Sequence, residues 1–510
     1  MSRLFVLLFI SIILLSCSEE LKPETGYADT PRLLSFVLHS GQNLEILQDD
    51  VEGEIIGDSI VECWIPYLVP DKHLAVDIQS SGGGIFVGGS IFNEKSRYDF
   101  SRPVTVMISD GNIQKDYKVY IHSFTGLPVL WVETEQRLPI TSVDDYIAAH
   151  FILQEDVVTR GAGERLEIDG KIRGRGNSTW VQVKKPYRIK FDKKESVFGE
   201  AADKNWVLLA NYFDKSMLRN ALAFYLGSLS NLQYTPKFHF MELMLNGRYT
   251  GTYQLTEALK VNKNRINIGE DGFLLEIDNH LRENEVSFTT PRLEFPIRIH
   301  EPELTVEDPD YIYIRDYMLK AEEALFSDDF LDEHKGYRQY FDIESFADWY
   351  VITELLENPE AGDGYMSKTR NGKLHMGPLW DFDLAIGNNA YATYGDDSVN
   401  PYFLFTRYQH YNPYWNRLFQ DPQFVSLVKS RMNYFISKKD DIMRFINEYA
   451  LYLKKSVAEN DNRWGLLYQE PRTQPQTVLN VWGSYQNEVQ YIKNFLNLRI
   501  DWLKKEFETY

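Results

Sequence analysis

Residues 173–191 read RGRGNSTWVQVKKPYRIKF, and this stretch decides how the main part of the chain is interpreted. Six lysines and arginines lie within residues 173–190 of an otherwise acidic protein. Gly174 and Gly176 permit a tight backbone beside these charges, and arginine binds phosphate through paired hydrogen bonds. The alternation in residues 187–191 predicts a strand. The stretch therefore predicts a phosphate-binding site, with a solvated basic hairpin as the alternative.

A second stretch with chemical character lies at residues 377–388, which read GPLWDFDLAIGN. Asp381 and Asp383 stand in an apolar setting, separated by one phenylalanine. Carboxylates in such surroundings are costly unless they are paired or bind a metal. Mg²⁺ prefers one or two carboxylates together with phosphate oxygens. The spacing predicts a divalent-metal site, and a capped loop is the alternative.

Four motifs in one order carry a family resemblance. They are RGRGNSTW…KKPYRIKF (173–191), KNWVLLANYFDKSMLRN (204–220), GTYQLTE (251–257) and GPLWDFDLAIGN (377–388). Together they resemble the CotH (spore coat protein H) kinase family, in the form common in Bacteroidetes lipoproteins, over about residues 128–440. The resemblance implies a divergent protein-kinase-like fold. It also implies ATP as substrate, Mg²⁺ or Mn²⁺ as cofactor, and transfer of phosphate to serine hydroxyls of envelope or secreted proteins.

The resemblance also suggests which residues contact the nucleotide. Lys190 lies on a predicted strand, at the position of the phosphate-contacting lysine of kinases. Arg173 and Arg175 are the alternative phosphate contacts. The predicted hairpin 238–255 leads to Thr256-Glu257 at the hinge, where Glu257 is expected to contact ATP. Asp381 takes the metal-binding role of the Asp-Phe-Gly aspartate, and Asp383 either supports the metal or is structural.

The catalytic base is less well defined by the motifs. Family members usually place an aspartate before the Trp-Asp-x-Asp motif, where it accepts the proton of the substrate hydroxyl. Glu360 falls at that place here, and Asp363 follows three residues later. Either can serve as the base, although a misplacement near 1 Å can lower the rate about a hundredfold.

Two other functional classes stay open from the sequence. A degenerate kinase-like domain would act as a scaffold or as a glycan- or protein-binding surface lipoprotein. A glycoside hydrolase would use paired carboxylates, such as Glu354 or Glu357 with Asp381. A nucleic-acid partner is disfavoured, because 74 acidic against 54 basic residues give a net charge of −20 and phosphate backbones require a positive surface.

The N-terminus predicts export and a lipid anchor. Arg3 precedes an apolar run from Leu4 to Leu15, which is shorter than the about 20 residues that span a bilayer and typical of a secretory signal. Cys17 follows directly, in a context that resembles a bacterial lipobox, so lipidation at Cys17 is expected. Ser18-Glu19-Glu20 resembles the surface-export signal of Bacteroidetes lipoproteins. We therefore expect an outer-membrane lipoprotein, with the side of the membrane left open.

The chain divides into a signal peptide (1–17), a polar tether (18–28), a β domain (29–126) and a kinase-like domain (127–510). Short alternating runs with turn signals in 29–126 predict an immunoglobulin-like β-sandwich. The rest predicts an α+β kinase-like domain with an N-lobe (about 127–260) and a helical C-lobe (about 261–510). Helices are predicted at 214–228, 308–326, 340–357, 421–438, 439–456 and 484–507, and a hairpin is predicted within 166–173, turning at Asp169-Gly170. Cys63 is predicted to be a buried, unpaired side chain in a strand.

Overall fold

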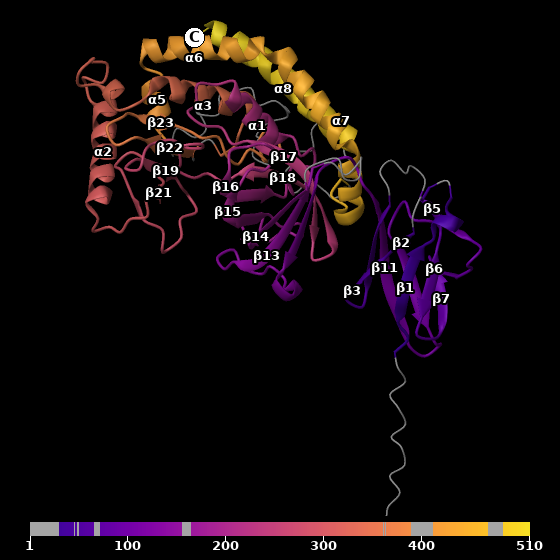
Figure 1. Ribbon diagram of the computed structural model, residues 1–510. Coiled ribbons are helices and arrows are strands. Elements are labelled where there is room, and N and C mark those ends of the chain that lie inside the picture. The colour runs from indigo at the N-terminus through magenta and orange to yellow at the C-terminus, as the bar shows by residue number, and fades with distance from the viewer. Residues whose placement is uncertain are drawn as a thin grey trace, which may run out of the picture.

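The computed structural model describes residues 30–509, apart from 45, 48–49, 66–71, 156–164, 361, 363, 389–411 and 468–482. Figure 1 shows three parts in chain order: N-terminal β-sheets, a central barrel and a largely helical C-terminal part. The predicted signal peptide, its lipidation site Cys17, the tether and Asp363 lie outside the described residues. No helix among the described residues is both long and apolar enough to cross a membrane.

The N-terminal part consists of β-sheets around one apolar core. Alternation points one side chain in two inward, so that Phe36, Val61, Val106 and Val119 are buried. Cys63 is buried in this core as a free thiol, as predicted. The sheet orders are β2(Val51–Glu52)-β1(Leu33–Leu38)-β6(Asp77–Ser80), then β3(Glu54–Ile56)-β4(Ile60–Ile65)-β11(Gln114–Ser123)-β10(Val104–Ser109)-β7(Gly84–Val87)-β8(Ser90–Ile91), and β5(His73–Ala75)-β9(Arg97–Asp99). The predicted β architecture is confirmed, and its immunoglobulin-like assignment stays a prediction.

The central part is a closed barrel of seven strands. Parallel pairing of the first strand with β17 closes it. Inward-pointing Ile168, Ile172, Ile189 and Trp206 fill its interior, so the charged residues that alternate with them along β14 and β15 face outward. The strand order is β12(Val129–Thr134)-β13(Ile147–Gln154)-β14(Arg165–Gly174)-β15(Tyr187–Glu195)-β16(Asp203–Leu209)-β18(Arg248–Glu257)-β17(Phe238–Leu245).

One predicted hairpin is wrong and another is confirmed. β14 runs straight through Asp169-Gly170, with no turn there. Gly170 is required instead for close approach, because a Cβ at this position would lie 2.7 Å from the backbone oxygen of Lys190 on β15. The hairpin between β17 and β18 is present, and its turn residues Asn246 and Gly247 have φ of 53° and 78°, as an Asn-Gly turn requires.

The C-terminal part combines helices with a small sheet. Each predicted helix is present, although α1 starts later than expected and α7 continues past residue 456 to Trp464. Proline after aspartate starts α2 and α6, where its missing N–H costs nothing. The helices are α1(Arg219–Ser228), α2(Pro309–Phe326), α3(Ile343–Leu356), α5(Tyr414–Leu418), α6(Pro422–Ser437), α7(Lys439–Trp464) and α8(Tyr485–Thr509). The sheet, which the sequence reading missed, has the order β20(Ser287–Phe288)-β21(Ile297–Glu301)-β19(Phe273–Ile277)-β22(Gly364–Lys368)-β23(Leu374–Met376).

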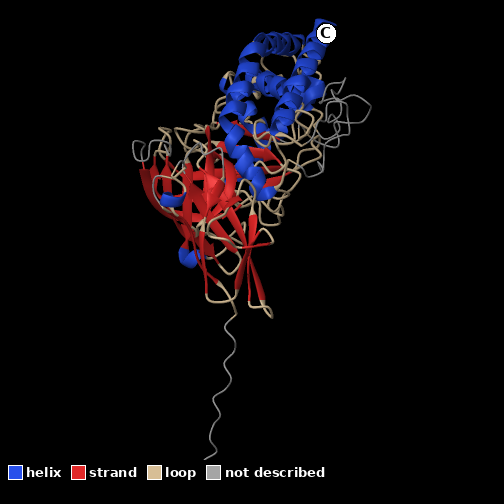
Figure 2. Ribbon diagram, turned by 90° about the vertical axis from the view of Figure 1, so that its right-hand side faces the viewer, coloured by secondary structure: helices blue, strands red, loops and turns tan. Residues whose placement is uncertain are grey.

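The three parts are joined by a buried polar junction. The helices gather at one end of the molecule (Figure 2), and α7 reaches from there to the N-terminal sheets (Figure 1). His122 of β11 is buried between Glu62 of β4, 3.0 Å from its Nε2, and Glu459 of α7, 3.4 Å from its Nδ1. Lys72 forms an ion pair with Glu459 at 2.7 Å, and the amide of Tyr249 in the barrel donates to Glu62 at 3.0 Å. The N-terminal sheets are therefore anchored on the rest of the chain.

Candidate active site

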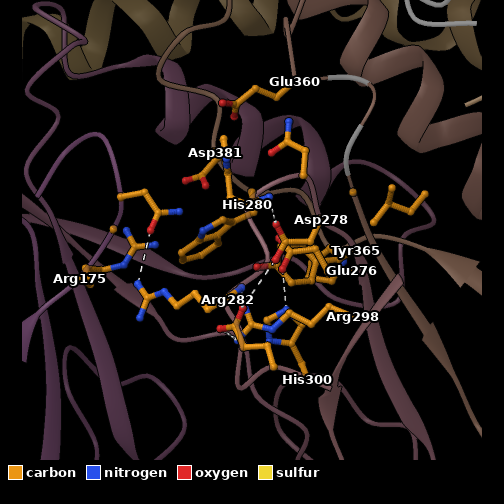
Figure 3. Close-up of a pocket in the computed structure, with 18 of the residues that line it drawn as sticks. Arg175, Glu276, Asp278, His280, Arg282, Arg298, His300, Glu360, Tyr365 and Asp381 are labelled. Carbon is orange, nitrogen blue, oxygen red and sulfur yellow. Dashed lines mark hydrogen bonds and ion pairs between the residues drawn. The ribbon is translucent and has the colours of Figure 1, made fainter. Parts of the chain in front are cut away.

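A cavity of about 350 Å³ lies where the barrel meets the C-terminal sheet, and we call it the central cavity. Its walls come from the ends of β14 and β15, from β19 and β21, and from the loops around residues 358–360 and 378–382. Figure 3 shows Asp381 between Glu360 and Arg175, with the charged residues of β19 and β21 clustered at the other side. Elements far apart in the sequence thus supply one strongly charged site.

Three arginines form one wall, named here the arginine wall: Arg173, Arg175 and Arg188. Arg173 is held by the carbonyls of Val143 and, at 3.1 Å, of Gly174. The Nε of Arg188 is buried and has no hydrogen-bond partner within the described part of the chain. Burial lowers the pKa of Arg188, and the charges of Arg173 and Arg175 lower it further. Since a buried guanidinium strongly prefers an acceptor, the wall can take up an anion.

Asp381 faces the arginine wall from the loop that carries the Asp-Phe-Asp sequence. Its backbone is in the left-handed region, with φ of 56°. Asp381 is an exposed residue that lines the cavity, although the surrounding protein partly desolvates its carboxyl. This desolvation raises the pKa of the Asp381 carboxyl; Arg175 opposes the rise and Glu276 adds to it. A cation at Asp381 would relieve this cost.

Asp383 points toward a smaller cavity of about 210 Å³ next to the first. Burial raises the pKa of Asp383 to about 7, with help from the negative charges of Asp381 and Asp214. The two cavities share Arg175, Glu360 and Asp381 in their walls. Asp381 therefore lines both cavities, and Asp383 lines the smaller one.

The opposite wall is made of charged side chains that are paired with one another. His300 lies 2.6 Å from Glu276. Arg298 contacts Glu285 at 2.5 Å and Asp278 at 3.5 Å. These pairs satisfy each other's charge, in contrast to Arg188 and Asp381. In the wall opposite, the charged side chains are paired with one another. The part of the cavity with the arginine wall and Asp381 can accept a charged ligand.

Sequence reasoning missed this second wall and Arg188. The signal was present in residues 273–280, where the apolar run Phe-Leu-Leu changes to Glu-Ile-Asp-Asn-His. A buried strand that ends in polar residues of this kind is the same pattern as the Trp-Asp-Phe-Asp stretch. Arg188 lay within the basic stretch already singled out, but Lys190 was chosen there by analogy.

Of the predicted site residues, the structure brings Arg173, Arg175, Glu360 and Asp381 together around the central cavity. Asp383 joins them in the adjoining one.

The other two predicted nucleotide contacts, Lys190 and Glu257, lie outside the walls of both cavities. Lys190 is exposed on β15, opposite Lys171 and Asn205, and lies among the wall residues of neither cavity. Arg188, two residues earlier on the same side of the strand, lines the central cavity instead. Glu257 is buried, receives a hydrogen bond from Tyr234 Oη at 2.9 Å and lies 3.4 Å from Arg265. Its contacts are those of a structural ion pair.

The donor set fits a nucleotide with one carboxylate-bound cation better than a closed metal centre. No group of three or more His, Cys, Asp or Glu side chains suited to a metal ion is present in the described ranges. Mg²⁺ commonly binds one or two carboxylates and completes its shell with water and phosphate. Asp381, which is open to the cavity, can supply the carboxylate, and Arg188, whose Nε has no hydrogen-bond partner among the described residues, can bind phosphate.

Comparison with known proteins gives a family and little else. A family model described as CotH kinase protein matches residues 172–503, which is more than half of the chain. No curated protein matches the sequence. A solved structure provisionally assigned as a glycoside hydrolase, from Bacteroides thetaiotaomicron VPI-5482, is 13% identical and covers 57% of this chain and 88% of its own. Its TM-score of 0.17 is too low to carry an argument about fold or activity.

Proposed function

We propose that this chain, which belongs to the CotH kinase family, transfers the γ-phosphate of ATP to hydroxyl groups of envelope or secreted proteins. The observation that carries the proposal is that the arginine wall and Asp381 face each other across one cavity. Phosphoryl transfer needs positive charge around the phosphates and an anchor for a cation, and little covalent chemistry from the protein. Both requirements are met by residues within the family match at 172–503.

Each residue of the site then has a chemical role. Arg173, Arg175 and Arg188 bind the phosphate oxygens, and Asp381 holds a divalent cation, with Asp383 beside it. When bound, that cation neutralises part of the charge on the phosphates. The acceptor oxygen forms its bond to the γ-phosphorus while the bond to the β-phosphate oxygen breaks and ADP leaves. Glu360, which lines both cavities, takes the proton of the acceptor hydroxyl; Asp363 is the alternative base.

We further propose that the protein is an outer-membrane lipoprotein anchored through Cys17. The support is the apolar run before Cys17 and the acidic residues after it. The sheets of residues 33–123 would then hold the kinase domain close to the membrane, because they are docked on α7 through His122 and Glu459. Metabolic labelling with a fatty acid tests the anchor: label should enter the wild type and be absent from Cys17→Ala. Equal labelling of both would contradict it.

Nucleotide binding is tested most simply by thermal unfolding with and without Mg·ATP. A ligand that binds only the native state increases the free energy of unfolding, by about 2.7 kcal/mol at a hundred times its Kd. The unfolding midpoint rises as a consequence. We expect a rise with Mg·ATP and a smaller one with ATP and a chelator. No change at millimolar Mg·ATP would favour the scaffold alternative, in which the kinase-like domain binds partners without catalysis.

A further inference from the structure

The loop that carries Asp381 is fastened to the start of helix α1 by hydrogen bonds from Arg219, a buried arginine that is ion-paired with Asp214. Asp214 and Arg219 are both fully buried, and their side chains meet at 2.6 Å. The same guanidinium donates from Nε to the carbonyl of Ala385 at 2.8 Å and from Nη2 to that of Ile386 at 3.4 Å. Arg219 is absent from the walls of both cavities. Its charge therefore acts on the loop backbone rather than on a ligand.

Asn220, the next residue, lines the smaller cavity, unlike Arg219, and holds the loop at a point still closer to Asp381. Its Oδ1 accepts a hydrogen bond from the backbone N–H of Phe382 at 2.8 Å. That amide directly follows Asp381, whose backbone φ of 56° is unfavourable for any residue other than glycine. A second asparagine closes the loop from the other end, since Asn388 donates to the carbonyls of Phe213 at 3.0 Å and Asp383 at 2.7 Å.

The main effect of these contacts is to fix the conformation of the loop backbone, rather than to stabilise the fold. A buried ion pair is often no more stable than well-packed apolar side chains of the same size. A guanidinium, however, offers five donors in a fixed plane, and Arg219 uses this plane to join one carboxylate to two carbonyls. An apolar residue would fill the same space but would not fix the backbone of the loop.

We propose that Arg219 and Asn220 are positioning residues that hold the Asp381 carboxylate where it binds the metal of the Mg·ATP complex. This inference rests on the proposed function. Residues that orient a metal ligand without touching the metal typically change metal affinity or activity by about 10–100-fold. Arg173 and Arg188 of the arginine wall lie on the barrel strands β14 and β15 rather than on this loop, and Arg175, which follows β14, contacts the loop through the Trp380 ring. Loss of Asn220 should therefore weaken binding of the metal complex while leaving metal-free nucleotide binding intact.

The test compares two calorimetric titrations of the full chain. For Asn220→Ala we expect about tenfold or greater weakening of Mg·ATP binding, with the Kd of ADP in chelator within about twofold of wild type. Higher Mg²⁺ or Mn²⁺ should restore part of the transfer rate. Arg219→Lys keeps the positive charge opposite Asp214 but loses the planar guanidinium, and it should weaken Mg·ATP binding in the same way as Asn220→Ala. Ser228→Ala, at the far end of α1, removes one hydrogen bond to Tyr225 and should change neither titration.

The outcomes separate this inference from the function on which it rests. If the Arg219 variant fails to fold, the Asn220 variant still decides. Equal weakening of both titrations, or no weakening of either, would overturn the positioning role while leaving the kinase proposal standing. If the wild type itself binds no Mg·ATP, the proposed function fails and the positioning role falls with it.

Discussion

The guanidinium of Arg175 lies 5.5 Å from the centre of the Trp380 ring, and Trp380 immediately precedes Asp381. This cation–π contact joins the Arg-Gly-Arg-Gly stretch at the end of β14 to the Asp-Phe-Asp loop. The two segments are more than two hundred residues apart in the chain, and each has little meaning as a binding site alone. Their contact gives the cavity a positive wall and a carboxylate within one space.

The first prediction concerns which basic residue of β15 binds phosphate. Arg188→Ala should weaken Mg·ATP binding about tenfold to a hundredfold, because a hydrogen bond to a charged group contributes about 1.5–3 kcal/mol. Lys190→Ala is the matched control, since Lys190 is two residues away on the same face and exposed. Calorimetric titration of the two variants measures the difference. Weaker binding only in Lys190→Ala would assign the phosphate contact to Lys190, as the sequence predicts.

That contrast also shows how far the sequence could lead. The basic stretch, the Asp-Phe-Asp loop, the helices and the β17–β18 hairpin were predictable, because each depends on local pattern. The choice between Lys190 and Arg188 was not, because both face outward on one strand and only the position of the C-terminal sheet decides which is covered.

Closure of the barrel likewise depends on the pairing of β12 with β17, which are distant in sequence. The Asp169-Gly170 pair was misread for a related reason. Glycine serves tight turns and close backbone contacts equally well, and local sequence cannot separate the two. Pairings of this kind set the second wall of the cavity, so its residues were missed.

The second prediction identifies the base. Glu360→Gln should lower kcat by about 10²–10⁴-fold, the usual contribution of general base catalysis, and leave the KM for ATP nearly unchanged, because the arginine wall and Asp381 are untouched. Steady-state transfer to a protein acceptor measures both constants. Asp363→Asn is the competing variant. A large loss of kcat in Asp363→Asn, with normal turnover in Glu360→Gln, would assign the role to Asp363.

The third prediction concerns stability and pH at the buried junction, beside which the buried Glu242 of β17 accepts a hydrogen bond from Ser456 of α7 at 3.3 Å. Burial raises the pKa of Glu242 to about 8, whereas an unfolded glutamate titrates near 4.3. Burial alone would lower the pKa of His122, but hydrogen bonds with Glu459 and Glu62 outweigh it and the pKa is raised. Both groups thus bind more protons in the folded than in the unfolded state. The stabilisation from both groups is complete at low pH and is lost as the pH rises. For Glu242 the loss occurs between about pH 4.3 and about pH 8, and for His122 it begins above about pH 6.5.

The free energy of unfolding should therefore fall between about pH 6 and 8, by up to about 1.4 kcal/mol per pH unit for each proton. Glu242→Gln mimics the protonated side chain and should flatten this slope. Denaturant titrations at several pH values measure it. An exposed residue of the neighbouring strand supplies the control, Glu133→Gln. An unchanged slope in Glu242→Gln would refute the assignment of the pH dependence to this junction.

The fourth prediction separates a structural carboxylate from a catalytic one. Glu354 and Arg499 form a buried ion pair at 2.5 Å between α3 and α8, and Glu354 does not line the central cavity. Removing one partner of such a pair costs about 3–5 kcal/mol, so Arg499→Met should be strongly destabilised in denaturant titrations. Replacing both partners by leucine should recover part of the loss. Normal stability of Arg499→Met would show that the ion pair contributes little to stability. The alternative in which Glu354 and Asp381 form the carboxylate pair of a glycoside hydrolase would then stay open.

The central claim is that Asp381 and the arginine wall together present the γ-phosphate for transfer. The most direct measurement is incorporation of label from γ-labelled ATP into envelope proteins, by the wild type, Asp381→Ala and the control Asp169→Ala. Asp169 is a largely exposed aspartate of β14, with 78% of its side chain accessible. We expect Mg²⁺-dependent labelling by the wild type and by Asp169→Ala, and none above background by Asp381→Ala. Equal labelling by the wild type and Asp381→Ala would contradict the account.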